Sequence, residues 1–196
     1  MVMKRTLGVY KISNERSVFK PPYGKMEVMT PKFFYYVSKF TVQYFPKGTF
    51  NAVKIVEKPI EIGWRDFYVD YFPEFSGPIV GSIFKRIKQE AEKENFYRVL
   101  GISPMMLWKK TSQGEYTNLF HGTSNSKIGL SSVASLWDGE SLDELILKVS
   151  NNCAHELGHT FGLEHHIDCL MDTERDRFNS RFCDECKNKI ISLLSH

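Results

Sequence analysis

The stretch HELGHTFGLEHHIDCLM, from His155 to Met171, carries histidines at the spacing of metal ligands. If the preceding residues form a helix that reaches Phe161, His155 and His159 lie on one face, one turn apart. Both imidazoles can then reach the same ion. Glu156 follows the first histidine, so its carboxylate lies beside the ion, where it can take a proton from water. This arrangement is the H-E-x-x-H pattern of zinc sites.

Gly162 and His165 extend the pattern. A glycine can adopt the left-handed conformation that ends a helix, so the chain can reverse after Phe161. The reversal returns His165 toward the ion as a third ligand. Three histidines leave one position of a tetrahedral zinc open, which is typical of catalytic sites. His166 is an alternative third ligand, although the offset from Gly162 favours His165.

Ser141 and Glu144 predict where this helix begins, because they form an S-x-x-E capping box. The residues that follow Ser141 divide into an apolar face and a polar face of the expected helix. The apolar face is expected to contain Leu142, Ile146, Val149, Cys153 and Leu157, and the polar face Lys148, Asn152, His155 and His159. We therefore expect the apolar face to anchor the helix and the histidines to face a cleft, with Cys153 as a small buried residue.

Four further potential ligands follow His165, spaced as H-x-x-C and C-x-x-C with thirteen residues between the two pairs. They are His166, Cys169, Cys183 and Cys186. Two short pairs joined by a loop are typical of a structural zinc site with four protein ligands. We expect this second site, within residues 166–186, to clamp the turn to a C-terminal helix over residues 184–194.

Two other interpretations explain these cysteines less well. A redox pair of Cys183 and Cys186 would leave Cys169 without a role. A zinc ribbon that binds nucleic acid would need a basic patch, and the acidic residues of this region offset its lysines and arginines.

Upstream of residue 141 the pattern predicts interleaved strands and helices around one sheet, without a repeat or linker. Helices are expected over residues 31–44 and 78–91, and an irregular aromatic loop over 63–77. Strands are expected over residues 4–11, 50–62 with a break at Pro59, 97–103, 105–108, 116–120 and 127–137. The segment 127–137 alternates, and as an edge strand it would be able to pair with an extended peptide.

Length and composition set broader limits. The 196 residues suit one compact domain over residues 1–196, with 42% hydrophobic and 25% charged residues, as in soluble enzymes. A net charge of +3 is too small to favour nucleic acid or an anionic membrane as partner. No apolar run approaches the roughly 18 residues of a membrane helix, and the first residues lack the apolar core of a signal peptide. We expect a cytoplasmic monomer.

With these residues in place, the chain resembles the metzincin zinc peptidases and, within them, the archaemetzincins of peptidase family M54. That family joins HExxHxxGxxH to a downstream methionine and a set of cysteines. The zinc-binding pattern is matched by His155, Glu156, His159, Gly162 and His165. Met171 matches the methionine of the Met-turn. Three of the four family cysteines are matched by Cys169, Cys183 and Cys186. At the position of the first family cysteine, directly after the third histidine, this chain has His166, which is also a type of zinc ligand.

The resemblance implies an α+β fold with α/β-like character, the compact zincin fold. Its sheet would be mixed and twisted, with an antiparallel edge strand, helices behind it and a zinc-clamped C-terminal helix. It also implies a zinc-dependent metallopeptidase that acts on peptides or proteins, with Glu156 as general base and acid and two zinc ions per chain. The alternatives are a catalytically weak, zinc-stabilised module that binds proteins or peptides, and a zinc amidase that acts on small substrates.

Overall fold

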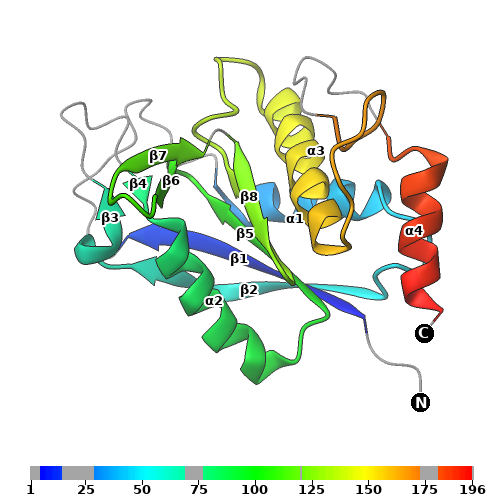
Figure 1. Cartoon of the computed structure of the whole chain (residues 1–196), viewed down its shortest axis with the longest axis horizontal. Helices are drawn as coiled ribbons and strands as arrows, with labels where there is room; N and C mark the ends of the chain where they lie inside the picture. The colour runs from blue at the N-terminus through cyan, green and yellow to red at the C-terminus, as the bar shows by residue number, and fades with distance from the viewer. Residues whose placement is uncertain (1–4, 15–28, 69–76, 120, 173–180, 196) are drawn as a thin grey trace.

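A five-stranded sheet forms the centre of the molecule in the computed structural model, which describes residues 5–14, 29–68, 77–119, 121–172 and 181–195. Its strands, in spatial order, are β2 (Ala52–Ile62), β1 (Thr6–Asn14), β5 (Arg98–Ser103), β9 (Ile128–Ser132) and β8 (Gly122–Asn125). The first four strands are parallel, and β8 runs antiparallel to β9 at one edge (Figure 1). The expected mixed sheet with an antiparallel edge strand is therefore confirmed.

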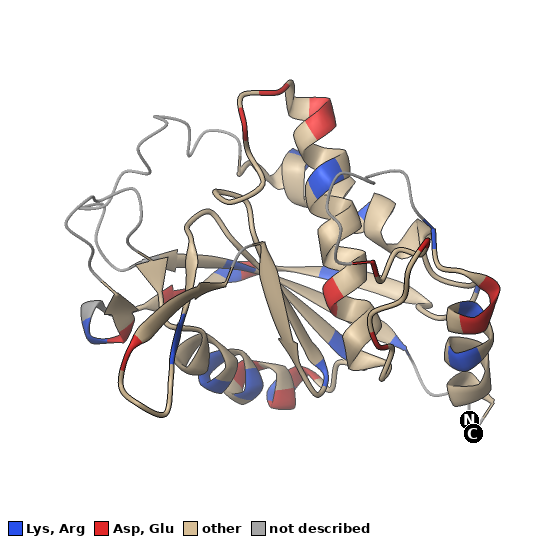
Figure 2. Cartoon of the chain, turned by 45° about the horizontal axis from the view of Figure 1, so that its top comes forward, with Lys and Arg blue, Asp and Glu red and all other residues tan. Residues whose placement is uncertain are grey.

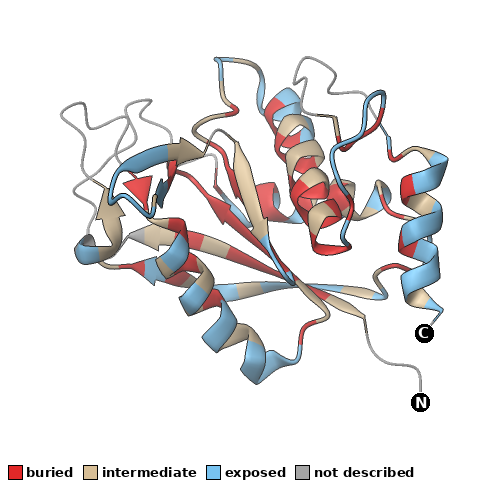
Figure 3. Cartoon of the chain, viewed as in Figure 1, coloured by how far each residue is buried: buried red, intermediate tan, exposed pale blue. Residues whose placement is uncertain are grey.

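Helices cover both faces of this sheet. Helices α1 (Pro31–Gln43) and α3 (Leu142–Thr160) lie on one face, and α2 (Val80–Glu94) lies on the other (Figure 1). The alternation of β1 explains the two layers, since Leu7 and Val9 pack with α1 and α3 while Tyr10 and Ile12 pack with α2. Figure 3 shows the resulting buried band through the sheet and along the inner sides of the helices.

The C-terminal helix α4 (Asp184–Leu194) has the predicted bounds. Cys186 and Ile190 place it in the same hydrophobic cluster as α1 and α3. The turn that follows α3 runs between α3 and α4 (Figure 1). Residues that end one helix and begin another are therefore gathered at one corner of the molecule.

Local signals explain where the helices begin. At α1, the Thr30 side chain accepts a hydrogen bond from the Phe33 amide at 3.2 Å, and Pro31 occupies the first turn. At α3, Ser141 and Glu144 form the predicted capping box. Helix α2 begins at Val80, two residues after the predicted start, and ends at Glu94, where the C-cap residue Asn95 adopts a left-handed conformation.

The remaining described elements are short. The segment expected as an aromatic loop contains the 3-10 turn η2 (Trp64–Asp66) and strand β3 (Phe67–Tyr68), which pairs with β4 (Gly77–Pro78). Strands β6 (Leu107–Lys110) and β7 (Tyr116–Leu119) form an antiparallel hairpin. Residues 69–76 of the expected loop, residue 120 of the expected strand 116–120 and the beginning of the expected strand 4–11 lie outside the described residues.

The strand expected over residues 127–137 differs from β9 in length and in place. It ends at Ser132, because a turn follows in which the Leu136 and Trp137 amides both donate to the Val133 carbonyl. All five of its residues are buried, and it lies between β5 and β8. The segment is therefore not an edge strand that could pair with a peptide. The edge on this side of the sheet is β8, which the sequence pattern did not indicate.

The break predicted at Pro59 is a bulge rather than an end. The partners of β1 jump from Val56, opposite Tyr10, to Ile60, opposite Ile12. Strand β2 then continues to Ile62. A proline is tolerated here because β2 is an edge strand and Pro59 lies within the bulge.

Candidate metal centres

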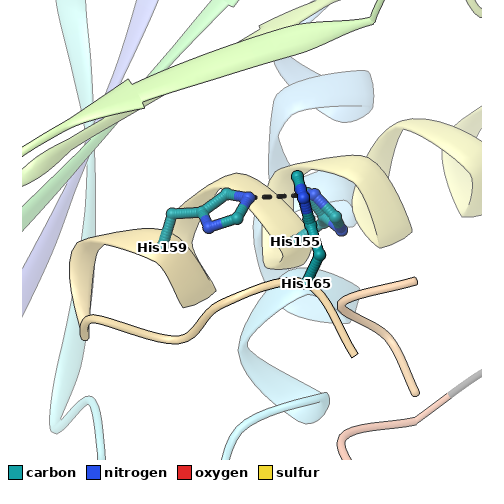
Figure 4. Close-up of side chains that lie close together, drawn as sticks. All are labelled: His155, His159 and His165. Atoms are coloured by element: carbon teal, nitrogen blue, oxygen red, sulfur yellow. Dashed lines mark hydrogen bonds between the residues drawn. The ribbon is translucent and has the colours of Figure 1, made fainter. Parts of the chain in front are cut away.

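Three histidines converge beyond the middle of α3. His155 and His159 lie one turn apart on the helix, and His165 comes from the turn that follows it (Figure 4). One potential ligand atom from each lies within 4.8 Å of the others. The Nε2 atoms of His155 and His159 are 3.1 Å apart. The structure therefore brings together the three histidines that the sequence singled out.

Backbone carbonyls fix the two helical rings. The Nδ1 atom of His155 lies 2.9 Å from the Leu170 carbonyl, and Nδ1 of His159 lies 2.9 Å from the Leu163 carbonyl. Since a carbonyl oxygen only accepts, both Nδ1 atoms donate, and in the neutral rings both Nε2 lone pairs face each other. Two lone pairs at 3.1 Å repel each other unless a cation lies between them. This donor set fits a zinc ion.

The environment of His159 favours its neutral form. Burial lowers the pKa of His159 and outweighs the opposing effect of its hydrogen bond to the Leu163 carbonyl. The nearby His165 lowers the pKa of His159 further. A neutral imidazole is the form that binds a metal.

Gly162 produces the reversal after α3, as predicted. Its φ angle is +73°, in the left-handed region. The Gly162 amide donates to the His159 carbonyl at 2.9 Å, and the Leu163 amide donates to the Gly158 carbonyl at 3.2 Å. From α4, Lys189 Nζ donates to the Gly162 carbonyl at 2.5 Å. The turn that carries His165 is thus held by both helices.

Glu156 lies between α3 and the pair of strands β8 and β9. The residue is only 6% exposed. A Cβ atom placed on Gly122 of β8 would lie 2.7 Å from Glu156 Oε1, and one on Gly129 of β9 would lie 3.3 Å from Glu156 Cβ. The carboxylate therefore has a fixed place directly under the edge strand, next to the first histidine.

Met171 lies beneath the helix. Its side chain is fully buried, and its Sδ atom would be 2.6 Å from a Cβ atom on Gly158 of α3. Its carbonyl accepts a hydrogen bond from the His166 amide at 3.3 Å. The methionine therefore packs against α3 at Gly158, the residue before His159.

A second cluster contains His166 and three cysteines. The Nδ1 atom of His166 lies 3.6 Å from Cys183 Sγ, and Cys169 Sγ lies 3.6 Å from Cys186 Sγ. Ligand atoms of His166, Cys169 and Cys183 lie within 4.8 Å of one another. The Cys183 amide also donates to Cys169 Sγ at 3.2 Å. All four predicted ligands of the second site are thus gathered between the turn and α4.

The two thiols of the C-x-x-C pair differ in acidity. Burial raises the pKa of Cys183, but hydrogen bonds from Cys186 and Cys169 outweigh it, and the net shift is downward. Burial raises the pKa of Cys186 well above its ordinary value. The hydrogen bonds between these thiols show that their sulfur atoms lie close together, as the ligands of one metal ion do.

Two residues of α3 complete the comparison with the predicted helix faces. Cys153 is fully buried, and burial raises its pKa to about 12, so it is the inert core residue that was expected. Leu142 is 50% exposed, whereas Leu145 is buried, so the assignment of Leu142 to the anchored face is wrong. Leu142 stands in the first turn, where α3 projects beyond the core (Figure 3).

The sequence interpretation missed the partners that hold the site. The Leu163 and Leu170 carbonyls orient the histidines, and Gly122 of β8 lies against Glu156. Every residue has a carbonyl, so no side-chain pattern marks such roles. The polar strand β8 likewise has no apolar alternation that would mark it.

These features define a zinc-dependent metallopeptidase. They are an antiparallel edge strand, a helix that carries two histidines and a glutamate, and a third histidine after a glycine turn. The model of peptidase family M54 matches residues 51–192, and the chain belongs to this family. The resemblance to the archaemetzincins is thereby confirmed.

Solved structures support this assignment through the fold. Archaemetzincin from Methanopyrus kandleri is similar with a TM-score of 0.65 and 21% identity, over 97% of this chain and 96% of that one. A zinc-dependent peptidase from Methanocorpusculum labreanum is similar with a TM-score of 0.57 and 18% identity, over 93% of this chain and 99% of that one. No curated protein sequence matches the chain.

Proposed function

We propose that the chain hydrolyses peptide bonds with a zinc ion held by His155, His159 and His165, and with Glu156 as general base and acid. The observation that carries the proposal is the pair of Nε2 atoms 3.1 Å apart, each aimed by a carbonyl bond at Nδ1, with a shielded carboxylate on the adjacent residue. A bound zinc ion supplies Lewis acidity, which polarises a scissile carbonyl and makes water a stronger acid.

Glu156 performs the proton transfers in this proposal. Its carboxylate takes a proton from water and delivers it to the leaving nitrogen. With 6% exposure, Glu156 is largely shielded from bulk solvent. The rings of His155 and His159 keep their orientation because each is bonded at Nδ1 to the backbone.

The edge strand supports a peptide substrate rather than a small amide. Within the described part of the chain, β8 pairs only with β9, so its other side offers backbone donors and acceptors. An extended peptide can add to such an edge as a further strand. Because Gly122 of β8 touches Glu156, a peptide on this edge would pass close to the carboxylate.

The second cluster supports a structural zinc, which gives two ions per chain. Its four ligands would be His166, Cys169, Cys183 and Cys186, and four protein ligands leave no open position. This ion would join the turn after α3 to the start of α4.

We further propose that residues 1–196 act as one catalytic domain, a cytoplasmic monomer that binds neither nucleic acid nor membranes. Both α2 and α4 carry residues of both signs (Figure 2), which supports the absence of such partners. Among the described residues, no helix combines the length and apolar character needed to span a bilayer.

Replacing Glu156 with glutamine tests the assignment. We expect Glu156→Gln to keep its zinc and to lose about 10²–10⁴-fold in peptide hydrolysis, because the amide cannot accept the proton. The matched control is Glu164→Gln, an exposed glutamate on the neighbouring turn, which should keep the wild-type rate. A Glu156→Gln variant that retains zinc and the wild-type rate would overturn the assignment.

A mixed peptide library, with and without a chelator, separates the two alternatives. Chelator-sensitive cleavage of peptides supports the peptidase. Binding of peptides without cleavage would favour a zinc-stabilised binding module, and cleavage confined to small amides would favour an amidase.

A further inference from the structure

Asn152 links the zinc-binding helix to two strands. Its Nδ2 atom donates to the His121 carbonyl at 3.0 Å and to Ser131 Oγ at 2.8 Å. Because a carbonyl only accepts, the group that faces His121 must be the amide NH2, and both of its hydrogens are engaged. The side chain therefore joins α3 to β9 and to the residue before β8.

His121 is itself held from several sides. Its carbonyl also accepts a bond from the Ser132 amide at 2.7 Å, and its amide donates to Ser135 Oγ at 3.0 Å. Its φ angle of 67° is uncommon for a residue other than glycine. Such a conformation persists where surrounding contacts determine it, and Asn152 supplies the contact from α3.

The same strand pair covers Asn152 and Glu156. Gly122 of β8 is the register partner of Ser131 of β9. Asn152 binds Ser131 and the residue before Gly122, while Gly122 lies against the Glu156 carboxylate. Asn152 and Glu156 are four residues apart, so they lie on one face of α3, one turn from each other.

We propose that Asn152 is a positioning residue, which sets the distance between the edge strand β8 and Glu156 and so aligns an extended peptide for hydrolysis. This inference rests on the function proposed above. It explains why a polar side chain bridges α3 and the sheet at this point.

Strand β8 needs such a link because it is short. It has four residues and, within the described part of the chain, one neighbouring strand. A peptide paired with β8 follows every displacement of the strand relative to Glu156. A shift of about 1 Å in a reacting group can cost about 100-fold in rate.

Replacing Asn152 with aspartate gives the most direct variant, since it keeps the shape and turns the donor toward His121 into an acceptor. Asn152→Ala, which removes the donor without adding a charge, is the second variant. The control is Gln113→Glu, which turns an amide into a carboxylate at an exposed position in the turn between β6 and β7.

Two measurements are made on the zinc-loaded full chain. Hydrogen exchange of the amides of residues 122–125 is expected to accelerate about tenfold or more in both Asn152 variants, as loss of a bond to a buried partner predicts, and to stay unchanged in the control. The second quantity is the ratio of kcat/KM for an extended peptide of about eight residues, long enough to pair with β8, to that for a blocked dipeptide amide. We expect this ratio to fall about 10- to 100-fold in the Asn152 variants and to stay at the wild-type value in the control.

The outcomes are distinguishable. An equal loss on both substrates, with an unchanged ratio, would mean a purely structural role and would overturn the proposal. Unchanged exchange in residues 122–125 would overturn it as well. If the wild-type chain cleaves neither substrate, the proposed function fails. In that case the affinities of the two peptides are measured by calorimetry, and the preference for the extended peptide replaces the kinetic ratio. A fall of this preference in the Asn152 variants supports the positioning role, and an unchanged preference overturns it.

Discussion

Two glycines allow other segments to approach α3 more closely than any side chain would permit. At Gly122, a Cβ atom would lie 2.4 Å from the Leu130 carbonyl oxygen and 2.7 Å from Glu156 Oε1. At Gly158, it would lie 2.6 Å from Met171 Sδ. Strand β8 and the Met171 side chain can therefore pack this closely against α3 only because Gly122 and Gly158 have no side chain.

Gly122→Ala is expected to impair both stability and activity. The added methyl meets a backbone carbonyl, which cannot rotate away, so β8 must move from its place over Glu156. We expect a loss of about 1–3 kcal/mol in the free energy of unfolding, measured by urea denaturation. We also expect kcat/KM for peptides to fall about 100-fold, because the strand that aligns the substrate is displaced.

Gly81→Ala is the control for this substitution. Gly81 lies in α2, and a Cβ atom there would meet no atom within 4 Å. Alanine is favoured over glycine in a helix by about 1 kcal/mol, so this variant should be equally stable or more stable, with unchanged activity. If Gly122→Ala keeps the wild-type rate, contact between β8 and Glu156 does not matter for hydrolysis.

At this scale the sequence predicted the histidine ligands and the Gly162 reversal, but not the backbone groups that orient the ligands. The histidines at positions 155, 159 and 165 were found because ligand spacing depends on residue type, and the structure brings them together. The carbonyls that aim two of them, and the close approach at Gly122, depend on how distant segments fold back, and no local pattern encodes this.

Helix α3 is stabilised at both ends. This matters because His155, Glu156 and His159 all lie on this helix. At its C-terminus, Arg98 Nε donates to Thr160 Oγ1 at 3.1 Å and Nη2 donates to the Thr160 carbonyl at 3.3 Å. The guanidinium also lies 4.5 Å from the centroid of the Phe161 ring. A positive charge here interacts favourably with the helix dipole.

Ser141→Ala is expected to weaken the other end of α3. Ser141 Oγ accepts a bond from the Glu144 amide at 3.3 Å, and Glu144 Oε2 accepts one from the Ser141 amide at 3.0 Å. Loss of the serine cap should lower the free energy of unfolding by about 1 kcal/mol in urea denaturation. Zinc content should not change, since the histidines lie beyond the middle of the helix. The exposed Ser112→Ala serves as control, and an equal effect of both substitutions would argue against the capping role.

The elements that the sequence failed to predict are those whose pairing is non-local. Strand β8 is four polar or small residues long, and it exists because β9 offers a partner and α3 lies beneath it. Strand β9 alternates in sequence, but all its residues are buried because β8 covers its edge and helices cover both faces. By contrast, α3 and α4 were predicted within a residue of their ends, because caps and helical spacing are local.

For the whole molecule, the main feature is that one turn contributes residues to two clusters of potential metal ligands. Adjacent residues face different clusters, with His165 beside His155 and His159, and His166 beside Cys183. Lys189 of α4 bonds to the Gly162 carbonyl of the same turn. An ion at the second cluster would therefore fix the turn that delivers the third histidine to the first.

Metal content tests this arrangement. We expect the purified chain to hold two zinc ions, and His159→Gln and Cys186→Ser to hold one each, because each substitution removes one ligand from one cluster. The Cys186→Ser variant should also be cleaved faster by an added protease near α4, since loss of a structural ion releases the helix it clamps. Cys153→Ala is the matched cysteine control and should keep both ions, because Cys153 is fully buried in the core against α1 and the sheet. If the wild-type chain holds one zinc ion and the Cys186→Ser variant also holds one, the second cluster binds no zinc. In that case packing alone, through residues such as Phe182 and Ile190, would hold α4 against the catalytic turn.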